Sequence, residues 1–192
     1  MGGRRHLAPG QHVPEGEQSG RGRKKAWPTA LILDTQRVKN AATATGTPVG
    51  FDAGKLVKGR KRLVLPDTLG KILVSGVVPA NAVDEAAAIA CWDEVVATHE
   101  LLGQVQVVFV DSSFNGIFRE HLAQRSGIRV EKPAHVLVKK TNFCLHAWRW
   151  IVERTFAWLS ANRRLSKEYD RTLCHANAWI TVANIKRVLK FC

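Results

Sequence analysis

Two short apolar runs, each followed directly by an aspartate, constrain the fold of this chain most strongly. Ala30 to Leu33 is followed by Asp34, and Val105 to Val110, the most strand-like stretch of the chain, is followed by Asp111. Short apolar runs of this kind are typical of buried strands in a layered α/β sheet. A carboxylate at the end of a buried strand is costly unless it is solvated, paired or bound to a cation, so both aspartates are candidate functional residues.

The remaining apolar pattern predicts further strands and helices. The predicted strands are a hairpin of Leu63 to Leu65 and Ile72 to Val78, and short strands at Ile128 to Val130 and Val136 to Val138. The predicted helices span Asp84 to His99, Phe114 to Gln124, Ala147 to Leu165 and Ala176 to Phe191. The predicted buried side of the last helix consists of Trp179, Ile180, Val182, Ala183, Ile185 and Leu189. This order of elements predicts an α/β domain with a mixed sheet flanked by helices.

The helix predicted at Ala147 to Leu165 places one carboxylate, Glu153, among arginines. Helical spacing predicts a buried stripe made of Trp148, Ile151, Val152, Thr155, Trp158 and Leu159, and it places Arg149 and Glu153 on the opposite side. One interpretation is an exposed ion pair four residues apart, in the weaker order of cation before anion. The other is that Glu153 faces a cation such as a metal ion.

The chain is strongly basic, with 29 Lys and Arg against 16 Asp and Glu and a net charge of +13. This excess indicates a polyanionic partner, usually nucleic acid, although a ribosomal or membrane-surface protein could share it. Residues 1–25 are predicted to be a disordered basic tail before one domain at 26–192. No apolar run is long enough to span a bilayer, and the four widely spaced cysteines indicate reduced thiols, so we expect a cytoplasmic, nucleoid-associated protein.

The segment Gly50 to Arg62 concentrates positive charge at the predicted entrance to the hairpin. It contains Lys55, Lys58, Arg60, Lys61 and Arg62, interleaved with glycines. The segment taken alone slightly favours a solvated turn at the entrance of the hairpin over a surface that contacts phosphates.

Three carboxylates, Asp34, Asp111 and Glu153, could act together if the first and fourth strands are neighbours. Clustered carboxylates repel one another unless cations lie between them, and oxygen donors suit Mg²⁺ or Mn²⁺. Two such ions can activate the attacking oxygen and stabilise the leaving oxygen of a phosphodiester. The spacing alone is weak support, because 16 acidic residues offer many triples.

Several blocks of the chain, in one order from about Lys24 to the end, resemble the bacterial insertion-sequence DDE transposases of the insertion sequence five group. These blocks are Leu33 to Lys39, Gly50 to Lys55 with Lys58 to Arg62, Asp67 to Gly70, Pro79 to Asn81, Val110-Asp111 with Phe114 and Gly116, and Trp150 to Leu159 with Asn162 to Leu165. The resemblance implies a ribonuclease H-like catalytic domain with a mixed five-stranded sheet. It also implies that Asp34, Asp111 and Glu153 bind two Mg²⁺ or Mn²⁺ ions and that Arg149 helps to hold DNA.

The chain departs from the related insertion sequence four group at two positions near Glu153. His146 and Ser160 stand where that group carries Tyr and Lys, and Leu63 stands where the family often has His. Relatives also have an amino-terminal helical region that recognises the ends of the element. The short tail in its place is consistent with one half of a split transposase, in which case an upstream-frame half is a partner, or with a truncated one.

The function predicted from the sequence is DNA transposition: cleavage at the transposon ends and transfer of the freed 3′-hydroxyl to target DNA. Phosphate contacts are predicted for Lys55, Lys58, Arg60, Lys61, Arg62, Arg149, Arg163 and Arg164. The predicted partners are the terminal repeats, target DNA and a second copy of the chain. The first alternative is a DNA-binding remnant that no longer transposes, and the second is a basic ribosomal-type protein.

Overall fold

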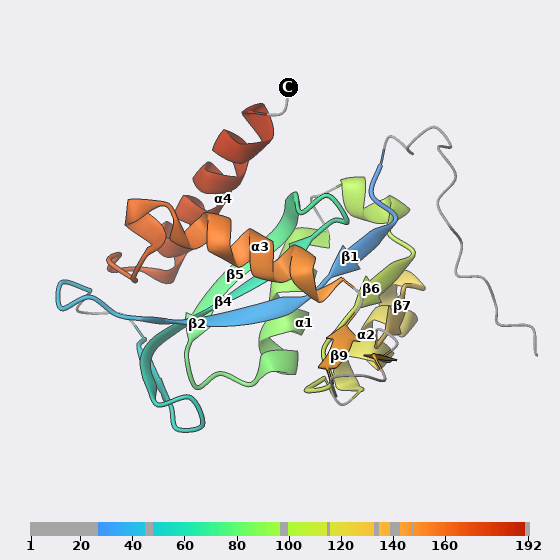
Figure 1. The fold of residues 1–192 in the computed structure, drawn as a ribbon, viewed down its shortest axis with the longest axis horizontal. Helices are drawn as coiled ribbons and strands as arrows, with labels where there is room; N and C mark the ends of the chain where they lie inside the picture. The colour runs from blue at the N-terminus through green and yellow to red at the C-terminus, as the bar shows by residue number, and fades with distance from the viewer. Residues whose placement is uncertain are drawn as a thin grey trace, which may run out of the picture.

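A computed structural model describes residues 27–44, 48–96, 100–114, 116–132, 135–138, 143–146 and 148–190. The tail predicted at 1–25 lies outside these residues. The strands are β1 (Ala30–Ile32), β2 (Asp34–Lys39), β3 (Gly50–Asp52), β4 (Val57–Pro66), β5 (Ile72–Pro79), β6 (Val107–Phe109), β7 (Arg129–Glu131), β8 (His135–Val138) and β9 (Phe143–His146). The α-helices are α1 (Asp84–Val96), α2 (Ile117–Ser126), α3 (Arg149–Ser160) and α4 (Leu173–Leu189), with short 3₁₀ helices at Glu100–Gln104 and Arg163–Leu165 (Figure 1).

The sheet is mixed, as the order of apolar runs predicted. β1 pairs in parallel with β6, and β6 pairs in parallel with β7. β2 and β5 pair antiparallel with opposite edges of β4, and β3 pairs with the start of β4. A single residue, Leu33, separates β1 from β2, and a bridge from Leu31 to Asp67 joins β1 to the end of β4. Counting β1 and β2 as one interrupted strand, the principal order is β5, β4, β1/β2, β6, β7.

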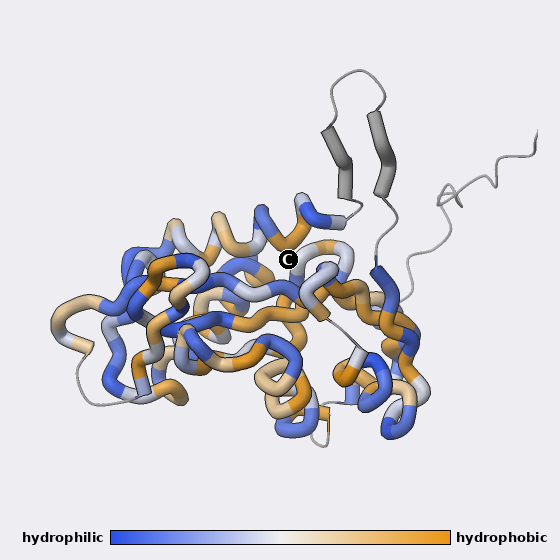
Figure 2. The backbone as a smooth tube through the Cα atoms, turned by 90° about the horizontal axis from the view of Figure 1, so that it is seen from below, coloured by the Kyte–Doolittle hydropathy of each residue, from blue (hydrophilic) through white to orange (hydrophobic). Residues whose placement is uncertain are grey.

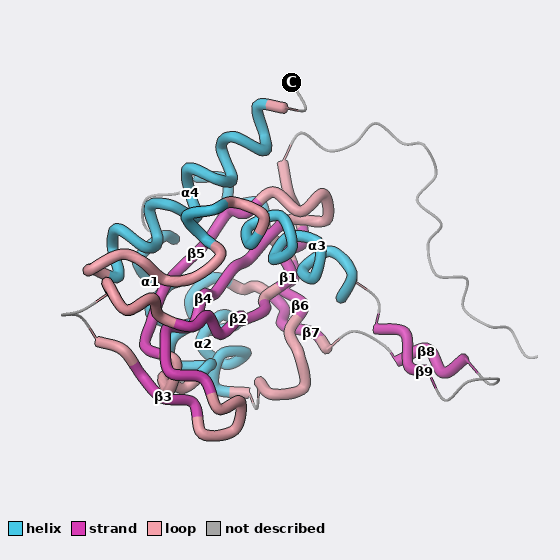
Figure 3. Tube along the Cα trace, turned by 60° about the vertical axis from the view of Figure 1, so that its left-hand side comes forward, coloured by secondary structure: helices cyan, strands magenta, loops and turns pink. Residues whose placement is uncertain are grey.

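Helices cover both faces of this sheet, so the domain has three layers (Figures 1 and 3). Successive residues of β4 point to opposite faces: Leu63 and Leu65 pack in the core that includes Trp92 of α1 and Phe118 of α2, whereas Val64 packs in the core on the other side. That second core includes buried side chains of α3 and α4. Figure 2 shows apolar stretches running through the middle of the body. None of the described helices is both long and apolar enough to cross a bilayer.

Two elements begin earlier than the sequence pattern predicted. β4 starts at Val57 instead of Leu63, so the second half of the basic segment belongs to a strand. α4 starts at Leu173 instead of Ala176, because Thr172 caps it by accepting a hydrogen bond from the His175 N–H at 3.1 Å. The strand predicted at Val136 to Val138 is present as β8, but it pairs with β9 in a separate hairpin.

The predicted buried side of α4 is largely wrong. Ile180 is fully buried, but Trp179, Val182, Ile185 and Leu189 are 38–67% exposed. Figure 1 shows the reason: α4 crosses the sheet only with its first part, and its carboxyl-terminal end extends beyond the body. The stripe on α3 is closer to the prediction, because Ile151, Val152, Thr155 and Leu159 are buried together with Phe156. Trp148, placed on that stripe by its spacing, precedes the helix and is 37% exposed.

Gly59 should tolerate no side chain, because it lies where β4 meets both β2 and β3. A Cβ built on Gly59 would lie 2.0 Å from the carbonyl oxygen of Val38. We expect Gly59→Ala to lower the free energy of unfolding by about 2 kcal/mol, since the backbone of β2 must move away. Gly103→Ala is the matched control, because nothing lies within 4 Å of its added Cβ. Chemical denaturation of both variants measures the difference, and equal stabilities would contradict the close packing of β2 on β4.

Candidate active site and DNA-facing surface

Asp34 and Asp111 emerge at the same edge of the sheet. In the parallel pair, Ile32 of β1 lies opposite Phe109 of β6, and each aspartate follows two residues later. The N–H of Leu33 extends this pairing by donating to the carbonyl oxygen of Phe109 at 2.8 Å. The condition set by the sequence, that the first strand and the strand before Asp111 are neighbours, is therefore confirmed.

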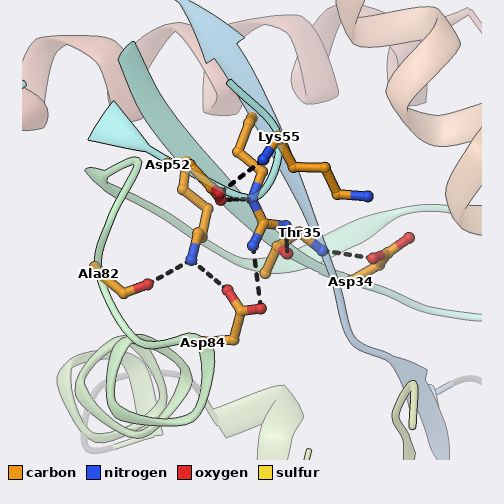
Figure 4. Close-up of polar contacts among 8 residues, drawn as sticks. Asp34, Thr35, Asp52, Lys55, Ala82 and Asp84 are labelled. Atoms are coloured by element: carbon orange, nitrogen blue, oxygen red, sulfur yellow. Dashed lines mark hydrogen bonds and ion pairs between the residues drawn. The ribbon is translucent and has the colours of Figure 1, made fainter. Parts of the chain in front are cut away.

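The two carboxylates influence each other electrostatically. Burial is the largest cause that raises the pKa of Asp34, to about 6, and the negative charge of Asp111 raises it further. The N–H of Thr35, which donates to Oδ1 of Asp34 at 2.7 Å (Figure 4), lowers this pKa. The positive charge of Arg149 also lowers it. Asp111 is exposed and accepts a hydrogen bond from the N–H of Ser112 at 2.6 Å.

The amino-terminal end of α3 lies against this edge of the sheet. The ring of Trp148 stacks on Phe109 of β6, with centroids 6.0 Å apart and an interplanar angle of 27°. Arg149 follows as the first residue of α3, and its Nε donates to Oε1 of Glu153 at 3.0 Å. Both side chains of this pair are 62% exposed. Arg149 thus contacts Glu153 directly, and its positive charge lowers the pKa of Asp34.

The donor chemistry of this edge suits a divalent cation. Asp34 and Asp111 provide the carboxylate oxygens that hard cations prefer, and a nearby cation would offset the burial and the repulsion by Asp111 that raise the pKa of Asp34. The third predicted ligand is not aligned with them. Within the described residues, no three His, Cys, Asp or Glu side chains are grouped closely enough to hold a metal ion. Glu153 is instead held by Arg149.

Three residues of the predicted phosphate-binding segment are inside the protein, which corrects that part of the prediction. Arg60, Lys61 and Arg62 are 0%, 2% and 0% exposed. Nε of Arg62 donates to Oε1 of Glu168 at 2.6 Å, and Nη1 of Arg60 lies 3.7 Å from the same carboxylate group. Side chains buried and paired in this way cannot contact a DNA backbone, so the phosphate contacts predicted for Arg60, Lys61 and Arg62 are wrong.

Lys61 belongs to a second internal cluster, which Figure 4 shows. Its ammonium group donates to the carbonyl oxygen of Ala82 and to Asp84, the first residue of α1. Arg37 lies between Asp84 and Asp52, with its Nε 2.7 Å from the Asp52 carboxylate. Asp84 thus places a negative charge at the start of a helix and also neutralises Lys61 and Arg37.

The other predicted phosphate contacts are exposed. Lys55 and Lys58 lie around the turn between β3 and β4, and Arg163 and Arg164 follow α3. Arg164 also forms an ion pair with Asp170 at 2.9 Å. Ser160 is exposed at the end of α3, whereas the side chain of His146 lies outside the described residues.

Sequence reasoning missed Glu168, which neutralises Arg60 and Arg62 from a position more than 100 residues away. Glu168 lies in a loop without apolar periodicity, and it reaches β2 through backbone hydrogen bonds with Lys39 and Ala41. No local signal marks it. A buried pair between such distant residues becomes visible only in the tertiary structure.

Comparison with known proteins agrees with this arrangement. Residues 27–185 match the family described as the transposase DDE domain. The chain belongs to this family. Its function is therefore that of a DNA transposase, and domains of this kind generally use divalent metal ions. No curated protein matches the chain significantly.

Two solved structures show that the fold is ribonuclease H-like. The catalytic core domain of BIV integrase has a TM-score of 0.50 and 13% identity, with 82% of each chain covered. An intasome of simian T-cell lymphotropic virus in complex with PP2A regulatory subunit B56 gamma has a TM-score of 0.50 and 16% identity. That match covers 94% of this chain and 52% of the other.

The buried pair of Arg62 and Glu168 should be important for stability. Arg62→Met would remove the shorter ion pair of Glu168 inside the protein, and of its ion pairs with the described residues the longer one to Arg60 would remain. We expect the free energy of unfolding to fall by about 3 kcal/mol, because a buried charge then lacks its main partner. Lys58→Met on the same strand is exposed and should change stability by less than about 0.5 kcal/mol. Urea denaturation tests both, and a neutral Arg62→Met would show that the pair is dispensable.

Asp34 should make stability depend on pH when no divalent ion is present. Its folded-state pKa of about 6 exceeds the ordinary value of 3.8, so folding favours the protonated carboxyl. The associated stabilisation is fully present below about pH 4 and is lost as the pH rises through about 6. Asp34→Asn should remove this dependence. Denaturation of both proteins across this range measures it, and parallel profiles would contradict the raised pKa.

Proposed function

We propose that the chain catalyses divalent-metal-dependent cleavage of DNA at transposon ends and joins the freed 3′-hydroxyl to target DNA. The observation that carries this proposal is the position of Asp34 and Asp111 at adjacent ends of parallel strands, with the pKa of Asp34 raised by burial and by Asp111. Membership of the transposase family supports it. The finer assignment to the bacterial insertion sequence five group rests on the sequence blocks around these residues.

In this proposal, Asp34, Asp111 and Glu153 hold two Mg²⁺ or Mn²⁺ ions. When bound, such ions activate the attacking oxygen and stabilise the leaving oxygen of the phosphodiester. Asp34 and Asp111 provide the rigid part of the site, because the pairing of β1 with β6 fixes their backbones. The side chain of Glu153 is exposed and paired with Arg149. It must give up this ion pair to bind a metal ion together with Asp34 and Asp111.

Arg149 has two roles in this proposal. In the structure its positive charge compensates Glu153 at 3.0 Å and lowers the pKa of Asp34. If divalent cations were bound by the acids, the guanidinium group of Arg149 would be available for a DNA phosphate, for which its fork of N–H donors is suited. Glu153 and Arg149 lie one helical turn apart on α3, so the exchange requires that this ion pair within the helix is broken.

The proposed DNA-facing surface comprises Arg149, Arg163, Arg164, Lys55 and Lys58, all of which are exposed. Such contacts position the backbone without reading its sequence. The terminal repeats and target DNA are the proposed substrates, and a second copy of the chain and an amino-terminal half from an upstream reading frame are the proposed protein partners.

Loss of either acid should separate catalysis from binding. Asp111→Asn and Glu153→Gln should each abolish Mg²⁺-dependent cleavage of DNA carrying the element's ends, because a neutral amide is a weaker ligand for a hard cation. DNA affinity should stay within about twofold, since phosphate contacts dominate it. Asp93→Asn is the control, because Asp93 pairs with His121 of α2, away from this edge. Gel assays measure cleavage, and retained activity in either variant would refute the assignment.

A strand-transfer assay distinguishes the active enzyme from a remnant that only binds DNA. The substrate is DNA with the terminal repeats already cut, mixed with a target plasmid and Mg²⁺. Joined product would support the proposed function. Binding without any product, under conditions where an intact relative joins its ends, would favour the remnant.

A further inference from the structure

The carboxyl-terminal half of α3, the projecting half of α4 and the start of β5 enclose a pocket that the predicted site does not include. Its volume is about 350 Å³. Ile72, Leu159 and Ala183 are apolar residues of its lining. Its positively charged residues are Lys186 and Arg187 of α4 and Lys190 directly after that helix. The lining residues are Ile72, Thr155, Trp158, Leu159, Ala161, Asn162, Ala183, Asn184, Lys186, Arg187 and Lys190, with no acidic residue among them.

Two guanidinium groups stack on the indole ring of Trp158 beside this pocket. Arg154 lies 4.7 Å and Arg187 4.3 Å from the ring centroid. In the described part of the chain neither arginine forms a salt bridge: Arg154 also stacks on Trp150 at 4.4 Å, and Arg187 donates to the carbonyl oxygen of Gly70. Asp67 favours the charge of Arg187 only through a longer-range interaction, and the charge of Arg154 opposes it. Positive charge is therefore in excess here.

Polar atoms inside the pocket also lack partners. Thr155 is 1% exposed, and its hydroxyl has no hydrogen-bond partner among the described residues. The same holds for Nε of Arg187, which also lines the pocket, and for Nε of Arg154, which lies beside the pocket on Trp158. Buried donors without acceptors are costly, so they indicate a group that the protein binds. An anionic oxygen would satisfy donors and neutralise charge at once.

We propose that this pocket binds a backbone phosphate of the DNA on which the domain acts, with the Thr155 hydroxyl and Arg187 as donors and Lys186 and Lys190 at its mouth. Helix α3 connects the pocket to the edge of the sheet that carries Asp34 and Asp111, called here the acidic edge. Trp158 lies nine residues after Arg149, or about 13 Å along the helix axis. The pocket would thus anchor duplex DNA a short distance from the cleaved bond. This inference rests on the proposed function for its partner.

Binding of a short mixed-sequence duplex without divalent ions tests the proposal separately from catalysis. Lys186→Gln combined with Lys190→Gln should weaken duplex binding by about tenfold. The negative slope of log K against log salt should become less steep by about 2, because two cations that neutralise phosphates are lost. Arg119→Gln combined with Arg129→Gln removes the same charge from exposed positions on α2 and β7 and should leave the slope unchanged. Equal slopes for the two double variants would overturn the proposal.

Thr155→Val gives a test without a change of charge. Removing the hydroxyl at nearly constant volume should weaken duplex binding about tenfold with an unchanged salt slope. Unchanged affinity in this variant would exclude the pocket as the place where phosphate is held. Thermal denaturation of each variant without DNA shows whether it remains folded.

Inorganic phosphate at matched ionic strength distinguishes the source of the ligand. If phosphate alone protects the wild-type protein against thermal unfolding, and the lysine variant loses this protection but keeps its duplex affinity, the pocket serves a small anion and the DNA proposal is refuted. Failure of the cleavage test with Asp111→Asn would refute the proposed function but leave these binding results interpretable. The two proposals therefore fail in different experiments.

Discussion

Neutralisation of buried positive charge in strand β4 is the constraint on which the rest of the structure depends. β4 pairs with β2, β3 and β5, so it cannot be moved to the surface, yet it carries three consecutive cations. Glu168 neutralises Arg60 and Arg62, and Asp84 pairs with Lys61. Each buried cation would otherwise cost several kcal/mol. These pairs connect the strand to the loop after α3 and to the start of α1, and so hold the helices of both faces in place.

The acidic edge depends on this framework only indirectly. Asp34 is the first residue of β2, whose partner β4 is tied down by the internal cations, and β1 immediately before it pairs with β6. Strand pairing therefore positions the backbones of the two aspartates, and their carboxylates accept hydrogen bonds from the neighbouring residues Thr35 and Ser112. This is the arrangement expected for acids that exchange partners during function, because a rigid backbone can carry an electrostatically strained side chain.

The buried side of helix α3 and its two ends contact different parts of the protein. Its buried stripe of Ile151, Val152, Phe156 and Leu159 packs on the sheet, and its amino-terminal end brings Arg149 and Glu153 to the acidic edge. Its carboxyl-terminal half contributes Thr155 and Trp158 to the pocket beside α4. One rigid element thus links the place of proposed chemistry to the proposed phosphate anchor, so both would contact the same DNA in a fixed relation.

The sequence by itself determined the layered α/β class, the two strands that end in Asp34 and Asp111, and the buried stripe of α3, because run length and periodicity are local properties. Only the tertiary structure decided which cations face water. Arg60 and Arg62 have the same local signature as Lys55 and Lys58, but Glu168, distant in sequence, makes burial of the first two possible. The buried side that the pattern predicted for α4 was wrong, and the pattern left two interpretations of Glu153 open, since burial and pairing depend on what the fold places opposite each residue.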